Sequence, residues 1–351
     1  MTTPGQSEAM VSPPPARDKD WIRPRRPSFH FWERLTADPE FLIGLLLLSG
    51  FVAAALVAIY LYGDAVFVLT GTSGPFDGTL RPEYPAAPSA SHPFGVIWIA
   101  VTNPSTGTGW TGYDLAIALL KATPTDLVFV GGSIGGALLL GLYLGATAGY
   151  DQHGRDATVV NAAYIVAAVP PFFLVFVLFF GVVEFLRPVQ YLPVFGLLFV
   201  LVLWPYYAIA VRARAQQIAT EPFVEAARAS GATRRQILWR HIIPNSFFPV
   251  FAQVPIDVYN IFFVLTAFPF LPCLNPFLFG NLTAFPTTLP VPEWGYLLAK
   301  GACNTDSDIF LNYGYWWMYT FPAAVVVFFG ITVTMICDGA ERFVRFTSGV
   351  R

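Results

Sequence analysis

Long apolar stretches separated by polar segments dominate the pattern of this chain. Helices of about 20 residues cross the roughly 30 Å of hydrocarbon in a bilayer, and six stretches reach that length: residues 41–62, 127–150, 158–186, 191–211, 246–272 and 316–337. Continuous runs such as Phe41–Leu48 lack the alternation typical of a transmembrane barrel strand. Because helices satisfy their own backbone groups in lipid, the pattern predicts an all-α integral membrane protein with six transmembrane helices.

Polar segments divide the rest of the chain. The first loop is rich in glycine and proline, which predicts an irregular, turn-rich start followed by a short amphipathic helix over residues 112–120. The predicted division is a partly disordered cytoplasmic tail at 1–40, a first transmembrane helix at 41–62, an extracytoplasmic loop at 63–126, a transmembrane domain at 127–337 that includes a cytoplasmic loop at 212–245 and an extracytoplasmic loop at 273–315, and a cytoplasmic tail at 338–351.

The basic residues predict the orientation in the membrane. Lysine and arginine accumulate in short segments on the cytoplasmic side. With the N-terminus inside, sixteen of the 20 basic residues fall on that side, and the other four are Arg81, Lys121, Arg187 and Lys300. Six crossings then place both termini in the cytoplasm.

Composition and motifs exclude several function classes. Hydrophobic residues make up 55% of the chain and charged residues 12%, with a net charge of -2, so neither a water-soluble fold nor nucleic-acid binding is expected. The sequence has no phosphate-binding GxxxxGK[ST], no HExxH and no GxSxG, and its three cysteines lack zinc or redox spacing. We expect no catalytic residue, metal site or cofactor, and we expect the glycines of Gly131–Gly136 to pack helices.

The cytoplasmic segment between the fourth and fifth spans predicts a helix-turn-helix. Thr220 is placed to cap a first helix, Pro222 lies in its opening turn and Gly231 ends it. A second helix begins at once with the capping-box pattern Thr233-x-x-Gln236, and Pro244 is expected to stop it.

This segment resembles the EAA loop of permease subunits of binding-protein-dependent ABC importers. The residues that carry the resemblance are Glu225, Ala226, Ala227, Gly231, His241, Pro244 and Asn245. In that family the loop forms the coupling helix, which docks on the ATP-hydrolysing subunit. The resemblance therefore implies that these residues couple the membrane helices to ATP hydrolysis.

More specifically, the chain resembles the second, or C-type, permease of dipeptide and oligopeptide transporters. Matching segments follow in order from about residue 35 to the end: His92–Gly95, Gly112–Leu115, Ala148–Tyr150, Pro292–Gly295, Trp316–Pro322 and Asp338–Gly339. Two departures lie on the outward side. An insertion around 96–110 separates segments that are nearly contiguous in the family, and Phe268–Cys273 replaces a stretch rich in leucine and glycine.

The resemblance implies the ABC importer type I permease fold in the plasma membrane. It also implies a second homologous permease subunit, two ATP-binding subunits and an extracytoplasmic substrate-binding protein as partners, with lipid around the helices. Peptides are the expected cargo, and oligosaccharides or nickel and its chelates are the alternatives. A channel, a secondary carrier or a membrane scaffold would not need the coupling loop.

Two further sets of residues carry hypotheses. Asp257 lies within the fifth span near Gln253 and Asn260, and an intramembrane carboxylate either lines a translocation path or is satisfied by hydrogen bonds between helices. Cys273 and Cys303 fall together in the second outward loop, where they form either a disulfide or two free thiols.

Overall fold

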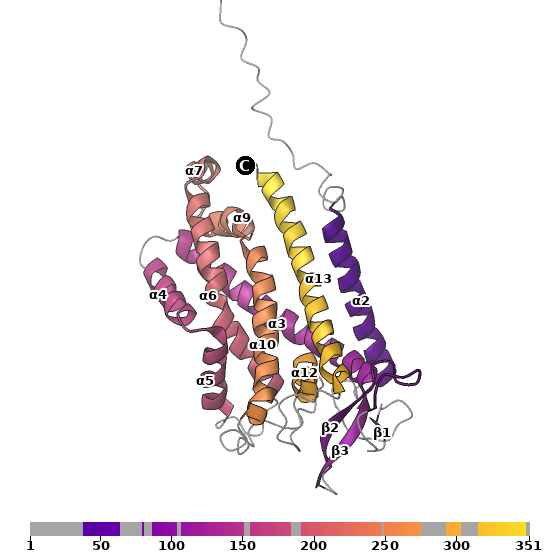
Figure 1. Ribbon diagram of the computed structural model, residues 1–351. Coiled ribbons are helices and arrows are strands. Elements are labelled where there is room, and N and C mark those ends of the chain that lie inside the picture. The colour runs from indigo at the N-terminus through magenta and orange to yellow at the C-terminus, as the bar shows by residue number, and fades with distance from the viewer. Residues whose placement is uncertain are drawn as a thin grey trace, which may run out of the picture.

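The computed structural model describes residues 38–63, 79–80, 86–103, 107–150, 155–183, 191–247, 249–274, 293–302 and 315–348. Most of these residues are helical (Figure 1). Among them, five helices are long and apolar enough to cross a membrane: α2 (Pro39–Tyr62), α3 (Leu115–Tyr150), α6 (Tyr191–Ala219), α10 (Val250–Leu274) and α13 (Trp317–Ser348). The prediction of a helical membrane protein is confirmed.

The third predicted span is not one helix. Residues 158–186 were predicted as a single span, but they contain α4 (Arg155–Ala167) and α5 (Pro171–Val183), whose axes are bent by 89° at the break. The break coincides with Pro170 and Pro171. Proline lacks the N–H that a helix requires and disfavours the helical conformation of the residue before it, so hydropathy continues through the bend while the helix does not.

The helix after the first outward loop begins earlier than predicted. α3 starts at Leu115 rather than at 127, inside the loop predicted for 63–126. Its 36 residues correspond to about 54 Å at 1.5 Å per residue, which exceeds the hydrocarbon thickness. Its first turns carry Lys121, Thr123 and Asp126, which are polar but buried. The prediction was wrong because it treated these polar residues as solvated.

The insertion in the same loop is a β-hairpin. β2 (Val96–Asn103) and β3 (Gly107–Asp114) are antiparallel, and β1 (Thr79–Leu80) joins β3 to give the order β1-β3-β2. The strands pair regularly from Val96–Asp114 to Asn103–Gly107, and the short helix predicted over 112–120 is helical only from Leu115, as the first residues of α3. Most of the glycine- and proline-rich start of the loop lies outside the described residues. The hairpin lies at the end of the molecule opposite α7 (Pro222–Ala229), beyond the outward ends of the helices (Figure 1).

Glycines on α3 set the closest packing between helices. A Cβ at Gly141, Gly145 or Gly149 would lie 2.5 to 2.7 Å from backbone or Cβ atoms of α6, so only glycine allows this approach. The sequence prediction named a different set. Gly131, Gly132 and Gly135 have nothing within 4 Å, and only Gly136 packs closely, against Val200.

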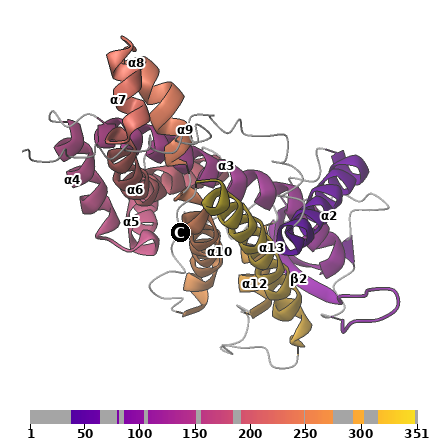
Figure 2. The ribbon, with the colours of Figure 1, turned by 90° about the horizontal axis from the view of Figure 1, so that it is seen from above.

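The short helix α12 (Trp294–Ala302) completes the outward half of the core. It packs against α3, α10 and α13, and the view along the bundle places it behind α13 and α10 (Figure 2). Trp294 is fully buried among the rings of Phe51, Phe262 and Phe329 at 5.5 to 5.8 Å. At the opposite end, Arg342 of α13 forms ion pairs with Asp38 and Glu40 at the start of α2.

Candidate functional site

The chain between α6 and α10 forms the predicted pair of helices. The first is α7 (Pro222–Ala229), and the second consists of α8 (Arg234–Ile237), the π-helix η3 (Leu238–Ile242) and α9 (Ile243–Ser246). α7 and α8 extend away from the other helices at one end and side of the molecule (Figures 1 and 2). This is also the end at which α2 begins and α13 ends, as the predicted cytoplasmic side requires.

The first helix is capped at its C-terminal end, and the predicted N-cap Thr220 does not cap its N-terminal end. The Thr220 hydroxyl donates to the Gln217 carbonyl at the end of α6, and Glu221 occupies the N-cap position before Pro222. At the other end the Gly231 N–H donates to Arg228 and the Ala232 N–H to Ala227. This is a Schellman motif, and Gly231 supplies the left-handed residue with φ of +83°.

The second helix begins as predicted but ends later. Thr233 and Gln236 form a reciprocal capping box. Pro244 does not stop the helix, which continues to Ser246. The π-helical turn before it shifts the pairing, so that the Ile243 N–H bonds to the Leu238 carbonyl, and Pro244 enters at the start of α9, where a missing N–H is tolerated.

The helix pair has a buried stripe and an exposed face. Val224, Ile237 and Ile242 are 0 to 1% exposed and anchor the pair to the membrane helices. The exposed residues include Glu225, Ala226, Gly231, Pro244 and Asn245. The structure therefore presents most of the predicted coupling residues on a single projecting element.

Two aromatic contacts connect this element internally and to the bundle. The ring of Phe223, which is 45% exposed, lies 5.9 Å from the half-buried ring of His241. The ring of Trp239 lies 6.3 Å from that of Tyr143 on α3. Asn245 adds a side-chain bond to the His241 carbonyl at 2.6 Å. The two helices are thus held to each other and to α3, which suits a rigid element.

The intramembrane carboxylate is enclosed within the chain. Asp257 is 0% exposed and accepts a hydrogen bond of 2.8 Å from Gln253 one turn earlier. Tyr207 of α6 and Asn260 lie beside it. The structure brings the three predicted residues together, but Asp257 Oδ2 is buried without a hydrogen-bond partner among the described residues, so both alternatives for this carboxylate stay open.

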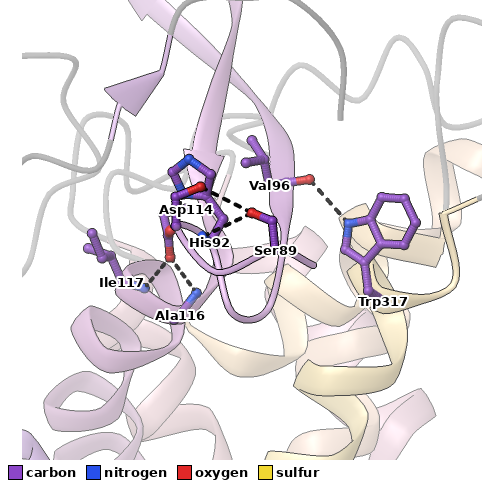
Figure 3. Close-up of polar contacts among 8 residues, drawn as sticks. Ser89, His92, Val96, Asp114, Ala116, Ile117 and Trp317 are labelled. Atoms are coloured by element: carbon purple, nitrogen blue, oxygen red, sulfur yellow. Dashed lines mark hydrogen bonds and ion pairs between the residues drawn. The ribbon is translucent and has the colours of Figure 1, made fainter. Parts of the chain in front are cut away.

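A polar cluster at the base of the hairpin was not predicted as a site from the sequence (Figure 3). Asp114 pairs with His92 at 2.7 Å through Oδ2, and its Oδ1 accepts the N–H groups of Ala116 and Ile117 at the start of α3. The Leu115 N–H donates to the Gly95 carbonyl at 3.0 Å. The two segments that the insertion separates in sequence are therefore adjacent in space.

The predicted disulfide between Cys273 and Cys303 lies outside the residues whose side chains the structure describes. It stays a prediction. Closing a loop of about 30 residues would stabilise the outward segment by roughly 3 to 4 kcal/mol through chain entropy. Non-reducing mass spectrometry distinguishes the two alternatives: a peptide linked through these cysteines supports the disulfide, and alkylation of both without reductant identifies two free thiols.

Comparison with known proteins agrees with this architecture. The family described as binding-protein-dependent transport system inner membrane component matches residues 137–345, from the middle of α3 through the helix pair to α13. The chain is 25% identical to the dipeptide transport system permease protein DppC of Alkalihalophilus pseudofirmus, over 93% of this chain and 91% of that protein. It is 28% identical to the oligopeptide transport system permease protein OppC of Haemophilus influenzae, over 66% of this chain and 65% of that protein.

A further relative is the probable D,D-dipeptide transport system permease protein DdpC of Escherichia coli, 23% identical over 72% of each chain. The family match covers more than half of the chain. The long apolar helices are those expected of a multi-pass membrane protein. The chain therefore belongs to the family of binding-protein-dependent transport system inner membrane components.

Proposed function

We propose that this chain is a permease subunit of an ATP-driven importer of peptides, and that its projecting helix pair couples the membrane helices to ATPase subunits. The observation that carries the proposal is the helix pair, whose corner is fixed by the Schellman motif at Gly231 and the capping box at Thr233. It exposes Glu225 and Ala226 and is anchored by Val224, Ile237 and Ile242. Family membership and the peptide-transport names of the relatives support it.

The geometry supplies a route for motion. α6 ends at Ala219 and α7 begins at Pro222, while α9 ends at Ser246 and α10 begins at Val250. Short connections on both sides mean that a displacement of the helix pair passes directly into two membrane helices. In the proposed importer, closure of two ATPase subunits moves the pair, and the path alternates between inward-open and outward-open states.

The proposed complex divides the work among its subunits. This chain and a second homologous permease enclose the path, the ATPase subunits hydrolyse ATP, and an extracytoplasmic binding protein delivers the cargo. The family is a transport component rather than a hydrolase. Oligosaccharides and nickel or its chelates are alternative cargoes for the same architecture, whereas a channel or secondary carrier would leave the coupling element without a role.

Reconstitution tests the proposal. Proteoliposomes that contain this chain, the second permease and the ATPase subunits should accumulate a labelled dipeptide when the binding protein is outside and ATP inside. Excess unlabelled peptide should compete, and maltotriose or Ni²⁺ should not. Uptake without ATP would favour a channel or carrier, and failure of the chain to co-purify with an ATPase would contradict the coupling role.

Glu225→Lys should eliminate this uptake while the amount of the chain in the membrane stays normal. Glu225 is exposed, so charge reversal changes the docking face without disturbing a buried contact. The residue also lies in the first turn of α7, where a negative charge is favourable. Peptide capture by the binding protein serves as the control. Uptake at the wild-type rate would contradict the assignment of Glu225.

A further inference from the structure

Two buried carboxyl groups meet where α12 packs against α3. Asp126 and Glu293 are each about 1% exposed. The Trp294 N–H donates to Asp126 Oδ2 at 2.9 Å, and the adjacent Gly295 N–H donates to Glu293 Oε2 at 2.8 Å. Because two successive backbone amides bind the two carboxyl groups, the groups lie side by side. Their remaining oxygens, Asp126 Oδ1 and Glu293 Oε1, are buried without a hydrogen-bond partner among the described residues.

The surroundings of this pair are largely apolar. Trp294, whose backbone N–H binds Asp126, packs its ring against Phe262 of α10, Phe329 of α13 and Phe51 of α2, and a Cβ at Gly295 would lie 3.0 Å from Leu265 of α10. Burial and the nearby charge of Glu293 both raise the pKa of the Tyr296 hydroxyl on α12. Lys121, which precedes Asp126 on α3, donates to the Tyr113 hydroxyl at 2.7 Å.

Two adjacent carboxylates in such an environment cannot both carry a charge at low cost. Desolvation penalises each anion, and the like charges repel. A single proton between them removes one charge and gives both free oxygens a partner, because a protonated carboxyl donates where a carboxylate only accepts. Burial raises the pKa of Glu293 above its ordinary value, which agrees with this arrangement.

We propose that Asp126 Oδ1 and Glu293 Oε1 share one proton, and that the resulting hydrogen bond positions α12 against α3 at the outward end of the permease. Asp126 and Glu293 are positioning residues in this scheme. The transport consequence rests on the proposed function, whereas the structural consequence can be measured on the chain itself.

Stability as a function of pH tests the shared proton. In Asp126→Asn the side-chain oxygen still accepts the Trp294 N–H, and the side-chain amide can donate to ionised Glu293. The variant pair therefore has the same charge and the same hydrogen bond as the singly protonated wild-type pair, but it has no shared proton to lose. A carboxyl whose pKa is raised on folding contributes stability below its unfolded pKa and loses it as the pH rises through the folded pKa. The folded pKa of Glu293 is about 8, so the melting temperature of the full wild-type chain should fall relative to that of D126N progressively from about pH 5 to pH 8, and the total fall should be at least about 2 °C at pH 9.

Two further variants separate positioning from general damage. Asp126→Ala should lower the melting temperature at every pH, because it leaves the Trp294 N–H and Glu293 Oε1 without a hydrogen-bond partner. Glu293→Gln should behave as D126N does. In the reconstituted importer, D126N should retain uptake and Asp126→Ala should reduce it severalfold.

Two results would overturn the proposal. One is a D126N variant destabilised as much as Asp126→Ala, with the same difference from wild type at every pH. The other is a wild-type melting temperature that falls with EDTA and recovers with Ca²⁺ or Mg²⁺, since that would assign the free oxygens to a cation. If uptake fails in all preparations while the pH-dependent difference is present, the proposed function is wrong and the shared proton stands.

Discussion

Gly231→Val is expected to reduce ATP-driven uptake by about tenfold or more, while the chain remains inserted and folded. Gly231 has φ of +83°, and the left-handed region costs an ordinary residue roughly 1 to 2 kcal/mol, a factor of about ten in population, and a β-branched residue more. The strain would open the Schellman motif that joins Ala232 to Ala227 and alter the angle between the two helices. Uptake in proteoliposomes, at matched amounts of complex, measures the effect.

The position allows a matched control for backbone conformation. A Cβ at Gly231 would meet nothing within 4 Å, so a side chain there is limited by its φ and not by a clash. Asparagine tolerates the left-handed region far better than valine. Gly231→Asn should therefore keep most of the uptake that Gly231→Val loses. Equal loss in both variants would show that the side chain, rather than the corner geometry, matters at the docking surface.

Gly145→Leu should prevent stable folding of the transmembrane domain. A Cβ at this position would lie 2.5 Å from the Ala208 carbonyl oxygen and 3.0 Å from its Cα, and backbone atoms of a packed helix cannot move aside without separating α3 from α6. Inserting side chains into a packed core typically costs about 1 to 3 kcal/mol, and a clash with backbone costs more. The expected result is a large loss of monodisperse protein in detergent and a lower melting temperature.

Gly131→Leu is the matched control on the same helix. Gly131 is exposed, and a Cβ at this position would meet nothing within 4 Å, so leucine there should leave the melting temperature of the isolated chain close to that of the wild type. If both variants unfold, the loss reflects leucine in α3 rather than the contact with α6. If neither does, the close approach at Gly145 is not required for stability.

The sequence alone determined the features that depend on neighbouring residues. Continuous hydrophobicity located most of the membrane helices, and the distribution of lysine and arginine predicts their orientation. The capping box at Thr233 and the left-handed corner at Gly231 were predictable because capping acts within a single turn. Averaging over neighbouring residues also explains the wrong prediction of one helix over 158–186. The mean hydropathy stays high across Pro170 and Pro171, although these prolines separate α4 from α5.

The tertiary structure decided what depends on segments far apart in the chain. Lys121 and Asp126 are buried near the start of α3 because Tyr113 and the Trp294 N–H bind them. Trp294 is 168 residues from Asp126, and no local sequence pattern predicts a partner at that separation. Likewise, Gly131 and Gly145 lie in the same apolar helix, yet a Cβ at Gly145 would clash with α6 and a Cβ at Gly131 would meet nothing within 4 Å. Hydrophobicity and capping are properties of a short segment, whereas burial of a polar group and the closeness of two helices are properties of the packed pair.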